Sequence, residues 1–259
     1  MKIRNILIPT DFSDSAESAL TFASEMALSL KARIIIMHSV KSTFSFASER
    51  LAEQLNKDDR LKNLEIETIL ETGDPALSTL NQSEEKKADM IIMGSKGRSG
   101  GRNLLGSTTI EIISKSPIPV LAIPQKAIYS GFENMVFTTN YHDGDLENLI
   151  ELVSFAKLFN SKLHVLHIDP EKNFEAHIKF TGFRELAGEK IDYMNIIFKQ
   201  IFNPSFYDGI EAYLKNNHIK LLTITRYKKT FFQKLTEKDH TKEMGININT
   251  PLLTLIGET

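Results

Sequence analysis

The chain has 259 residues, of which 41% are hydrophobic and 25% charged, and its formal net charge is −2. This length fits one large α/β domain or two domains of about 130 residues. A nearly balanced charge argues against a broad nucleic-acid-binding surface, which requires an excess of basic residues. The sequence contains no cysteine, which excludes disulfides, zinc–thiolate sites and thiol nucleophiles.

The distribution of apolar residues disfavours two further classes of protein, membrane-spanning proteins and secreted proteins. No apolar run approaches the roughly 20 residues that a membrane-spanning helix needs. The N-terminal apolar segment, 6–8, stops at Pro9 and is followed by acidic residues, whereas a secretory signal has a longer apolar core and a small-residue cleavage site. We therefore expect a cytoplasmic protein with no membrane partner and no nucleic-acid partner.

The first segments of the chain predict a strand, a helix and a second strand. The continuous apolar runs 6–8 and 34–37 are typical of a parallel sheet that is covered by helices on both faces. Ser13 and Ser15 are candidate caps for the helix between them. The apolar residues of that helix recur at spacings of three and four and are Ala16, Leu20, Ala23, Met26 and Ala27.

The remainder of the first half continues the alternation. The segment 64–70 predicts a third strand, and Asp74 followed by Pro75 predicts the N-cap and first position of a helix. A strand at 89–93, a glycine-rich loop and a helix through about residue 116 follow. The last strand is 119–123. This order predicts an open α/β sheet.

The second half repeats the first. Residues 5–40 align without a gap with residues 134–169, at an offset of 129, so that Thr10 falls on Thr139. The segment 250–256 likewise mirrors the last strand of the first half. We predict two tandem five-stranded parallel sheets flanked by helices.

The domain boundary is predicted near the short linker 126–134. This gives a domain at 1–127 with the glycine loop and a degenerate domain at 132–259 without it. We expect the two domains to pack as a pseudodimer through their apolar last strands, which would otherwise leave sheet edges open to aggregation. Pairing of two chains into a homodimer is left open.

The loop after strand 89–93 reads GSKGRSGGRNLLGSTT, residues 94–109. One explanation of its glycines is a simple turn. Another is that glycine lets successive backbone N–H groups approach a phosphate, with Gly106 opening a helix whose N-terminus favours anions. The second half has Thr225 and Lys228 at the positions of Gly94 and Gly97, so it lacks this chemistry.

The segments IPTDFS, GDPA and DMIIMGSKG…GST…PIPVLAIP together resemble the universal stress protein family, and the repeat resembles its tandem two-domain members. The resemblance implies a Rossmann-like, five-stranded parallel α/β sheet and, in one branch of the family, ATP or AMP binding by a motif G-x2-G-x9-G-[ST]. Here eight residues, not nine, separate Gly97 from Gly106. Either the flexible RSGGR segment compensates for the missing residue, or Gly106 and Ser107 are displaced from the positions that contact the phosphates.

The resemblance also implies roles for individual residues. Asp11 would contact the adenosine, in a pocket shaped by Pro9 and Thr10. Val40 would meet the adenine through its backbone, and Met93 would pack on the ring. The complete set of candidate nucleotide-binding residues is Pro9, Thr10, Asp11, Val40, Met93, Gly94, Lys96, Gly97, Arg98, Gly106, Ser107 and Thr108.

Within this set, Ser107 and Thr108 supply hydroxyl donors, and Lys96 and Arg98 offset phosphate charge. The cofactor would be ATP or AMP, with any Mg²⁺ carried by the nucleotide. No catalytic or metal-ligating residues are predicted, because no cluster of His, Asp and Glu has metal-site spacing.

Several of these features have simpler explanations. Asp11 alone can cap the first helix. His38 and its match His167 lie in apolar strands, where a structural role is expected. The run 226–234 alternates cations and aromatics, which superficially suits single-stranded nucleic acid, but we interpret it as a solvated helix or a contact between the halves.

We therefore predict a stress-response or regulatory protein that binds ATP or AMP in its N-terminal domain. A second nucleotide site is not expected, because Asn140 and Asp169 stand at the positions of Asp11 and Val40. A ligand-free interaction scaffold is one alternative. A slow ATPase is another, although the sequence has no G-x-x-x-x-G-K-[ST] loop and no nucleophile paired with a general base.

Overall fold

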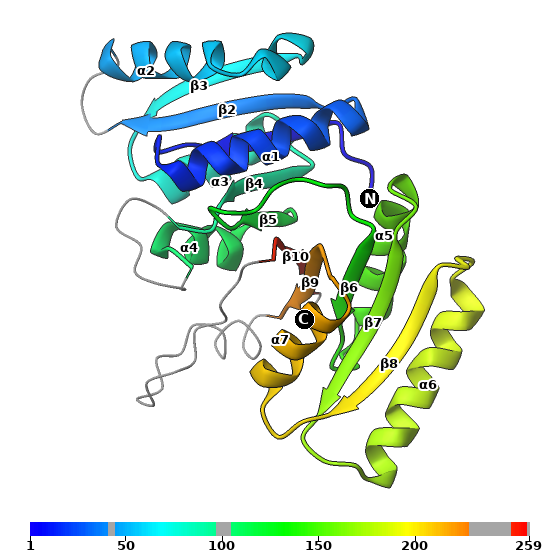
Figure 1. Ribbon diagram of the computed structural model, residues 1–259. Coiled ribbons are helices and arrows are strands. Elements are labelled where there is room, and N and C mark those ends of the chain that lie inside the picture. Colours follow the sequence, from blue (N-terminus) through cyan, green and yellow to red (C-terminus); the bar gives the residue numbers. More distant parts are fainter. Residues whose placement is uncertain (41–44, 97–104, 228–249, 258–259) are drawn as a thin grey trace. The chain divides into compact units, whose positions relative to one another are not determined.

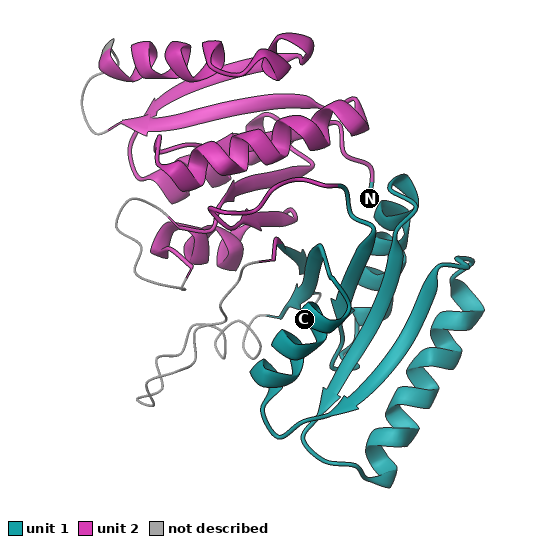
Figure 2. Ribbon diagram, in the orientation of Figure 1, with its two compact units in different colours: residues 1, 131–246, 252–259 teal, residues 2–130, 247–251 magenta. Residues whose placement is uncertain are grey.

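The computed structural model divides the chain into two compact units, coloured separately in Figure 2. We call residues 2–130 with 247–251 the N-terminal unit, and residues 131–246 with 252–259 and Met1 the C-terminal unit. The main division, between residues 130 and 131, lies within the segment 126–134. The described residues are 1–40, 45–96, 105–227 and 250–257.

The N-terminal unit is an open parallel sheet with strand order β3-β2-β1-β4-β5 (Figure 1). Its elements in chain order are β1 (Asn5–Pro9), α1 (Asp14–Leu30), β2 (Arg33–Val40), α2 (Ser45–Asn56), the 3-10 helix η1 (Asp59–Asn63), β3 (Ile66–Thr72), α3 (Pro75–Glu85), β4 (Met90–Gly94), α4 (Ser107–Lys115) and β5 (Val120–Ile123).

The C-terminal unit repeats this plan with strand order β10-β9-β6-β7-β8, again parallel. Its elements are β6 (Asn134–Thr138), α5 (Asp145–Leu158), β7 (Lys162–Asp169), α6 (Phe174–Lys190), β8 (Ile196–Phe202), α7 (Phe206–Asn216), β9 (Leu221–Arg226) and β10 (Leu252–Ile256). The predicted pair of five-stranded parallel sheets is confirmed. The packing of the two units through their last strands stays a prediction.

The strand order of the N-terminal unit defines where a ligand is expected. After β1 the chain adds β2 and then β3 on one side of β1, and it later adds β4 and then β5 on the other side. The strand order therefore reverses between β1 and β4. Right-handed crossovers then place α1 and α2 on one face and α3 and α4 on the opposite face; α3 lies beside α4, and η1 beside α1. Open α/β sheets bind ligands beyond the carboxyl ends of the strands at such a point.

Local signals in the sequence explain the starts of two helices. The Ser13 hydroxyl caps α1 by accepting from the Ala16 N–H at 3.3 Å. Asp74 caps α3 by accepting from the Leu77 N–H at 2.9 Å, with Pro75 at the first helical position. These three predictions are confirmed.

Ser15 does not cap α1, contrary to the expectation from sequence. It is buried one residue inside the helix, and its Oγ accepts from the backbone N–H of Lys96 at 3.4 Å. The beginning of α1 is thereby pressed against the end of β4. A Cβ added to Gly94 would lie only 2.6 Å from Ser15 Oγ and 2.8 Å from the Ser15 carbonyl carbon, so only glycine fits there.

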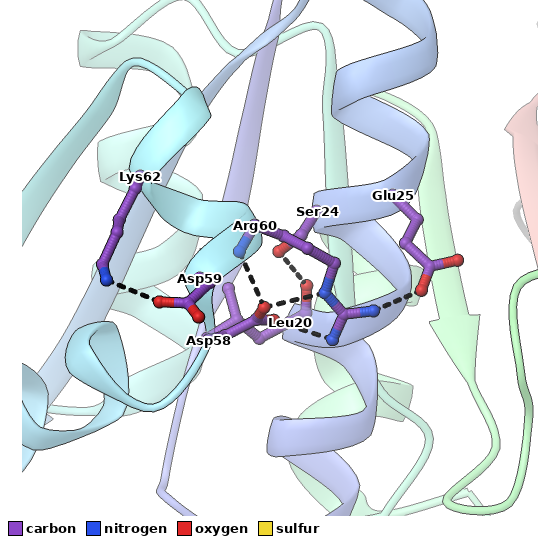
Figure 3. A network of polar contacts seen from close by, with 7 residues as sticks. All are labelled: Leu20, Ser24, Glu25, Asp58, Asp59, Arg60 and Lys62. Carbon is purple, nitrogen blue, oxygen red and sulfur yellow. Dashed lines mark hydrogen bonds and ion pairs between the residues drawn. The ribbon is translucent and has the colours of Figure 1, made fainter.

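Three helical segments, α2, α6 and η1, were missed because few buried apolar side chains mark them. Among the described side chains of α2, only Ala47 and Leu51 are buried. In α6 only Ala176 and Ala187 are buried. The short helix η1 is fixed to α1 by Arg60, whose guanidinium bonds both Asp58 and Glu25 (Figure 3). The hydrogen bond from Arg60 is the main cause that holds the pKa of Asp58 below its usual value.

The first testable prediction concerns Gly94 and needs only a stability measurement. We expect Gly94→Ala to lower the free energy of unfolding by about 1–3 kcal/mol, because the new methyl group overlaps the backbone of Ser15. Gly182→Ala in α6 is the matched control: nothing lies within 4 Å of its added Cβ, and the change should stabilise by about 0.5–1 kcal/mol. Equal effects of the two substitutions in urea unfolding would contradict this packing.

A second prediction concerns His164, which is buried in β7 with Nδ1 2.8 Å from the Tyr213 hydroxyl. Burial, and then the charges of Lys162 and Lys199, lower the pKa of His164 to about 4. An unfolded histidine titrates near 6.5, so between about pH 6.5 and 4 the unfolded chain binds more protons and folding stability falls as the pH falls.

His164→Gln removes this titration. We therefore expect the stability of wild type relative to His164→Gln to decrease by about 1–3 kcal/mol as the pH is lowered through that window. Urea unfolding of both proteins at several pH values measures the difference. A difference that does not change with pH would show that His164 is not held neutral by burial.

Candidate functional site

The loop after β1 is a compact turn at the carboxyl edge of the sheet. Thr10 Oγ1 accepts from the Phe12 N–H at 3.1 Å, and Asp11 Oδ1 accepts from the Ser13 N–H at 3.0 Å. Phe12 adopts a left-handed conformation with φ of 59°. Asp11 is thus not the cap of α1; its half-buried carboxylate instead orders the turn that leads into the cap.

A stack of three side chains supports this turn. His38 Nδ1 lies 2.6 Å from the carbonyl oxygen of Thr10. Since a carbonyl only accepts, Nδ1 carries a proton and donates it. The Phe12 ring lies 4.5 Å from the His38 ring, and the Arg50 guanidinium lies 4.5 Å from the Phe12 ring centroid. This arrangement gives His38 a structural role.

The start of α4 is docked onto the end of β4 by two hydrogen bonds. The Gly106 N–H donates to the Ser95 carbonyl at 2.8 Å, and the Thr109 hydroxyl donates to the Gly94 carbonyl at 3.1 Å. Gly106 is the N-cap, with ordinary extended angles (φ −66°, ψ 152°), so its backbone does not require glycine.

Among the described residues, no group neutralises the backbone dipoles at the first turn of α4. No side chain of the described residues caps this helix, and its first turn contains no acidic residue. Ser107 and Thr108 are exposed in that turn. A helix N-terminus of this kind carries roughly half a positive charge and favours anions.

The other predicted site residues take different positions. Pro9 ends β1, and Met93 is buried at the end of β4. Val40 is buried at the end of β2, where its carbonyl accepts from the Gly73 N–H at 3.3 Å. Lys96 is half-buried directly after β4.

Most of the predicted nucleotide-binding residues therefore lie at one edge of the sheet, at the ends of β1 and β4 and the start of α4. Val40 lies at the end of β2, on the other side of β1 from β4. Gly97 and Arg98 lie outside the described residues. Sequence reasoning missed Ser15, Ser95 and Thr109, which position the site. Of these, only Thr109 had a signal, its place in the GSTT segment.

The C-terminal unit contains the same turn. Tyr141 has φ of 60°, and its N–H donates to Thr139 Oγ1 at 3.0 Å. His167 Nδ1 lies 2.6 Å from the Thr139 carbonyl, with the Tyr141 ring 4.2 Å from the His167 ring. The aligned histidines of the two halves thus have the same structural role.

The side chains around this second turn are different and are bonded to one another. Asp169, aligned with Val40, lies with Oδ1 3.1 Å from His167 Nε2, and its Oδ2 accepts from Gln200 at 2.7 Å. Asp145, aligned with Ala16, is 1% exposed and accepts from the Tyr227 hydroxyl. Burial is the main cause that raises the pKa of Tyr227, and the bond to Asp145 adds to it.

Two kinds of feature are absent from the described residues. Across them, no group of three or more His, Cys, Asp or Glu side chains has the geometry of a metal site. No helix in the same residues has the length and apolar character needed to cross a membrane.

The sequence and the fold both match known proteins. The model of the universal stress protein family matches residues 2–124. Universal stress protein MJ0531 of Methanocaldococcus jannaschii is 30% identical over 138 residues, which cover 46% of this chain and 81% of that protein. Universal stress protein MJ0577 of the same organism is 29% identical over 155 residues, covering 48% and 96%.

A solved structure is similar over nearly the whole chain. The crystal structure of a universal stress protein from Archaeoglobus fulgidus covers 98% of this chain and 96% of its own, with a TM-score of 0.72 and 15% identity. This likeness shows the fold, which the two proteins share over nearly their whole length. From the sequence match and the fold together, the chain belongs to the universal stress protein family.

Proposed function

We propose that the N-terminal domain, 1–127, binds one adenine nucleotide, ATP or AMP, in a stress-response or regulatory role. The observation that carries the proposal is the start of α4: a helix N-terminus that no side chain of the described residues caps, with no acidic residue in its first turn, fixed at the end of β4. It lies at the point of the sheet where open α/β folds bind ligands. The family resemblance of the glycine loop adds to this.

The phosphates would lie against the first turn of α4. Ser107 and Thr108 are exposed there and offer backbone N–H and hydroxyl donors. Lys96, after β4, supplies a positive charge at the same edge. Any Mg²⁺ would enter with the nucleotide.

The adenosine would lie at the ends of β1 and β2. A carboxylate is a good acceptor for ribose hydroxyls or for the adenine amino group, and Asp11 is oriented for this by its bond from the Ser13 N–H. Thr10 and Val40 are both buried and would form the floor of this part of the pocket. The domain 132–259 would bind no nucleotide.

The test is titration of the full chain with ATP and AMP, with and without magnesium, using Ser107→Asp. A carboxylate at the first position of α4 improves the interaction with the helix dipole and should leave the melting temperature unchanged or raised. It also places a negative charge where the phosphates bind. We expect one site per chain in wild type and affinity reduced roughly tenfold or more in the variant.

Lys115→Gln is the matched control, because it makes the same net-charge change on the same helix but in its last turn, where Lys115 is exposed. Its nucleotide affinity should equal that of wild type. Equal weakening by both substitutions would show a general charge effect and contradict the site. Absence of binding at millimolar nucleotide would reject the proposal in favour of a ligand-free scaffold, and steady release of ADP would favour the slow ATPase.

A further inference from the structure

Asp145 is a buried carboxylate that accepts four hydrogen bonds. Oδ2 accepts from the Thr139 hydroxyl at 2.7 Å, from the Asn140 N–H at 3.1 Å and from the His142 N–H at 3.2 Å. Oδ1 accepts from the Tyr227 hydroxyl. The residue is only 1% exposed.

All four of these donors are neutral, and two of them are backbone N–H groups. Removing a carboxylate from water is costly unless hydrogen bonds replace its hydration. Proteins use converging backbone N–H and hydroxyl groups in this way to hold bound carboxylates and phosphates. The C-terminal unit thus holds the Asp145 side chain with the same kinds of donor group that hold a bound external anion in other proteins.

The ring of Tyr227 closes this arrangement. Its hydroxyl reaches Asp145, and its ring lies 4.7 Å from the ring of His142. The ring also lies directly against Gly257, because a Cβ added to that glycine would overlap it. Both the donors and the space beside them are therefore occupied by the chain itself.

The aligned positions of the N-terminal unit lack these two side chains. Ala16 stands where Asp145 is, and Lys96 stands where Tyr227 is. The turn that provides the donors is nevertheless repeated, with Thr10 Oγ1 accepting from the Phe12 N–H as Thr139 Oγ1 accepts from the Tyr141 N–H. The two units thus share a backbone turn but supply different carboxylates to it: half-buried Asp11 accepts from the Ser13 N–H, which aligns with the His142 N–H, whereas buried Asp145 accepts from all four donors.

We propose that Asp145 is a built-in anionic ligand. Its carboxylate accepts the hydrogen bonds of all four donors in the C-terminal unit. This unit therefore binds a small external carboxylate only when the Asp145 side chain is shortened. The inference concerns the C-terminal unit alone and stands whether or not the N-terminal unit binds nucleotide.

Chemical rescue of the full chain tests the proposal. Asp145→Ala leaves four donors without their acceptor, and we expect its melting temperature to fall by roughly 5–10 °C. Formate has the size and charge of the missing group. It should restore more than half of the loss, whereas sodium chloride at equal ionic strength and the neutral analogue formamide should restore none.

Asp145→Asn is the matched control, since its amide fills the same space and excludes formate. It should be destabilised and not rescued. Formate that raises the melting temperatures of wild type, Asp145→Asn and Asp145→Ala equally would overturn the proposal, as would no effect on Asp145→Ala.

Tyr227→Phe keeps the proposal testable if Asp145→Ala does not fold. It removes one donor but retains the carboxylate, so the melting temperature should fall and formate should not restore it. A Tyr227→Phe protein as stable as wild type would show that the Tyr227 hydroxyl is not part of the donor set that holds the Asp145 carboxylate, and this too would overturn the proposal.

Discussion

The close approach of α1 to the end of β4 constrains the edge of the sheet at which the candidate site of the N-terminal unit lies. In the N-terminal unit, Gly94 at the end of β4 leaves room for the backbone of Ser15 in α1. In the C-terminal unit, Thr225 stands at the aligned strand position and Gly144 at the aligned position before α5, where its φ of 91° by itself favours glycine. At the contact between α1 and β4 the strand residue must be glycine, because helix and strand pack there without space for a further side chain.

The edges of the two units differ in their chemistry. The C-terminal unit fills its edge with polar side chains that bond one another; Asn148 Nδ2, for example, donates to Thr225 Oγ1 at 3.2 Å and to the Ile256 carbonyl at 3.0 Å. The N-terminal unit has alanine at the positions of Asp145 and Asn148, namely Ala16 and Ala19. The two units therefore share a fold, but at this edge of the sheet only the C-terminal unit has the buried carboxylate of Asp145.

Much of this organisation could be predicted from sequence, for a physical reason. Continuous apolar runs define buried parallel strands, and Ser13, Asp74 and Pro75 act within one turn of their own position. The site could be placed roughly, because parallel strands bring their carboxyl ends to one edge. The packing of Gly94 on Ser15 and the bond between Tyr227 and Asp145 could not be predicted, because each joins residues about 80 positions apart in the chain, where local patterns carry no information.

Hydrogen exchange of the full chain with and without saturating ATP tests the contrast between the two edges most directly. The first turn of α4 and the ends of β1 and β4 should become protected, while the turn 139–145 stays unchanged because its donors are already bonded to Asp145. Protection confined to the N-terminal unit is the predicted result. Protection of the turn 139–145, or of neither edge, would contradict it.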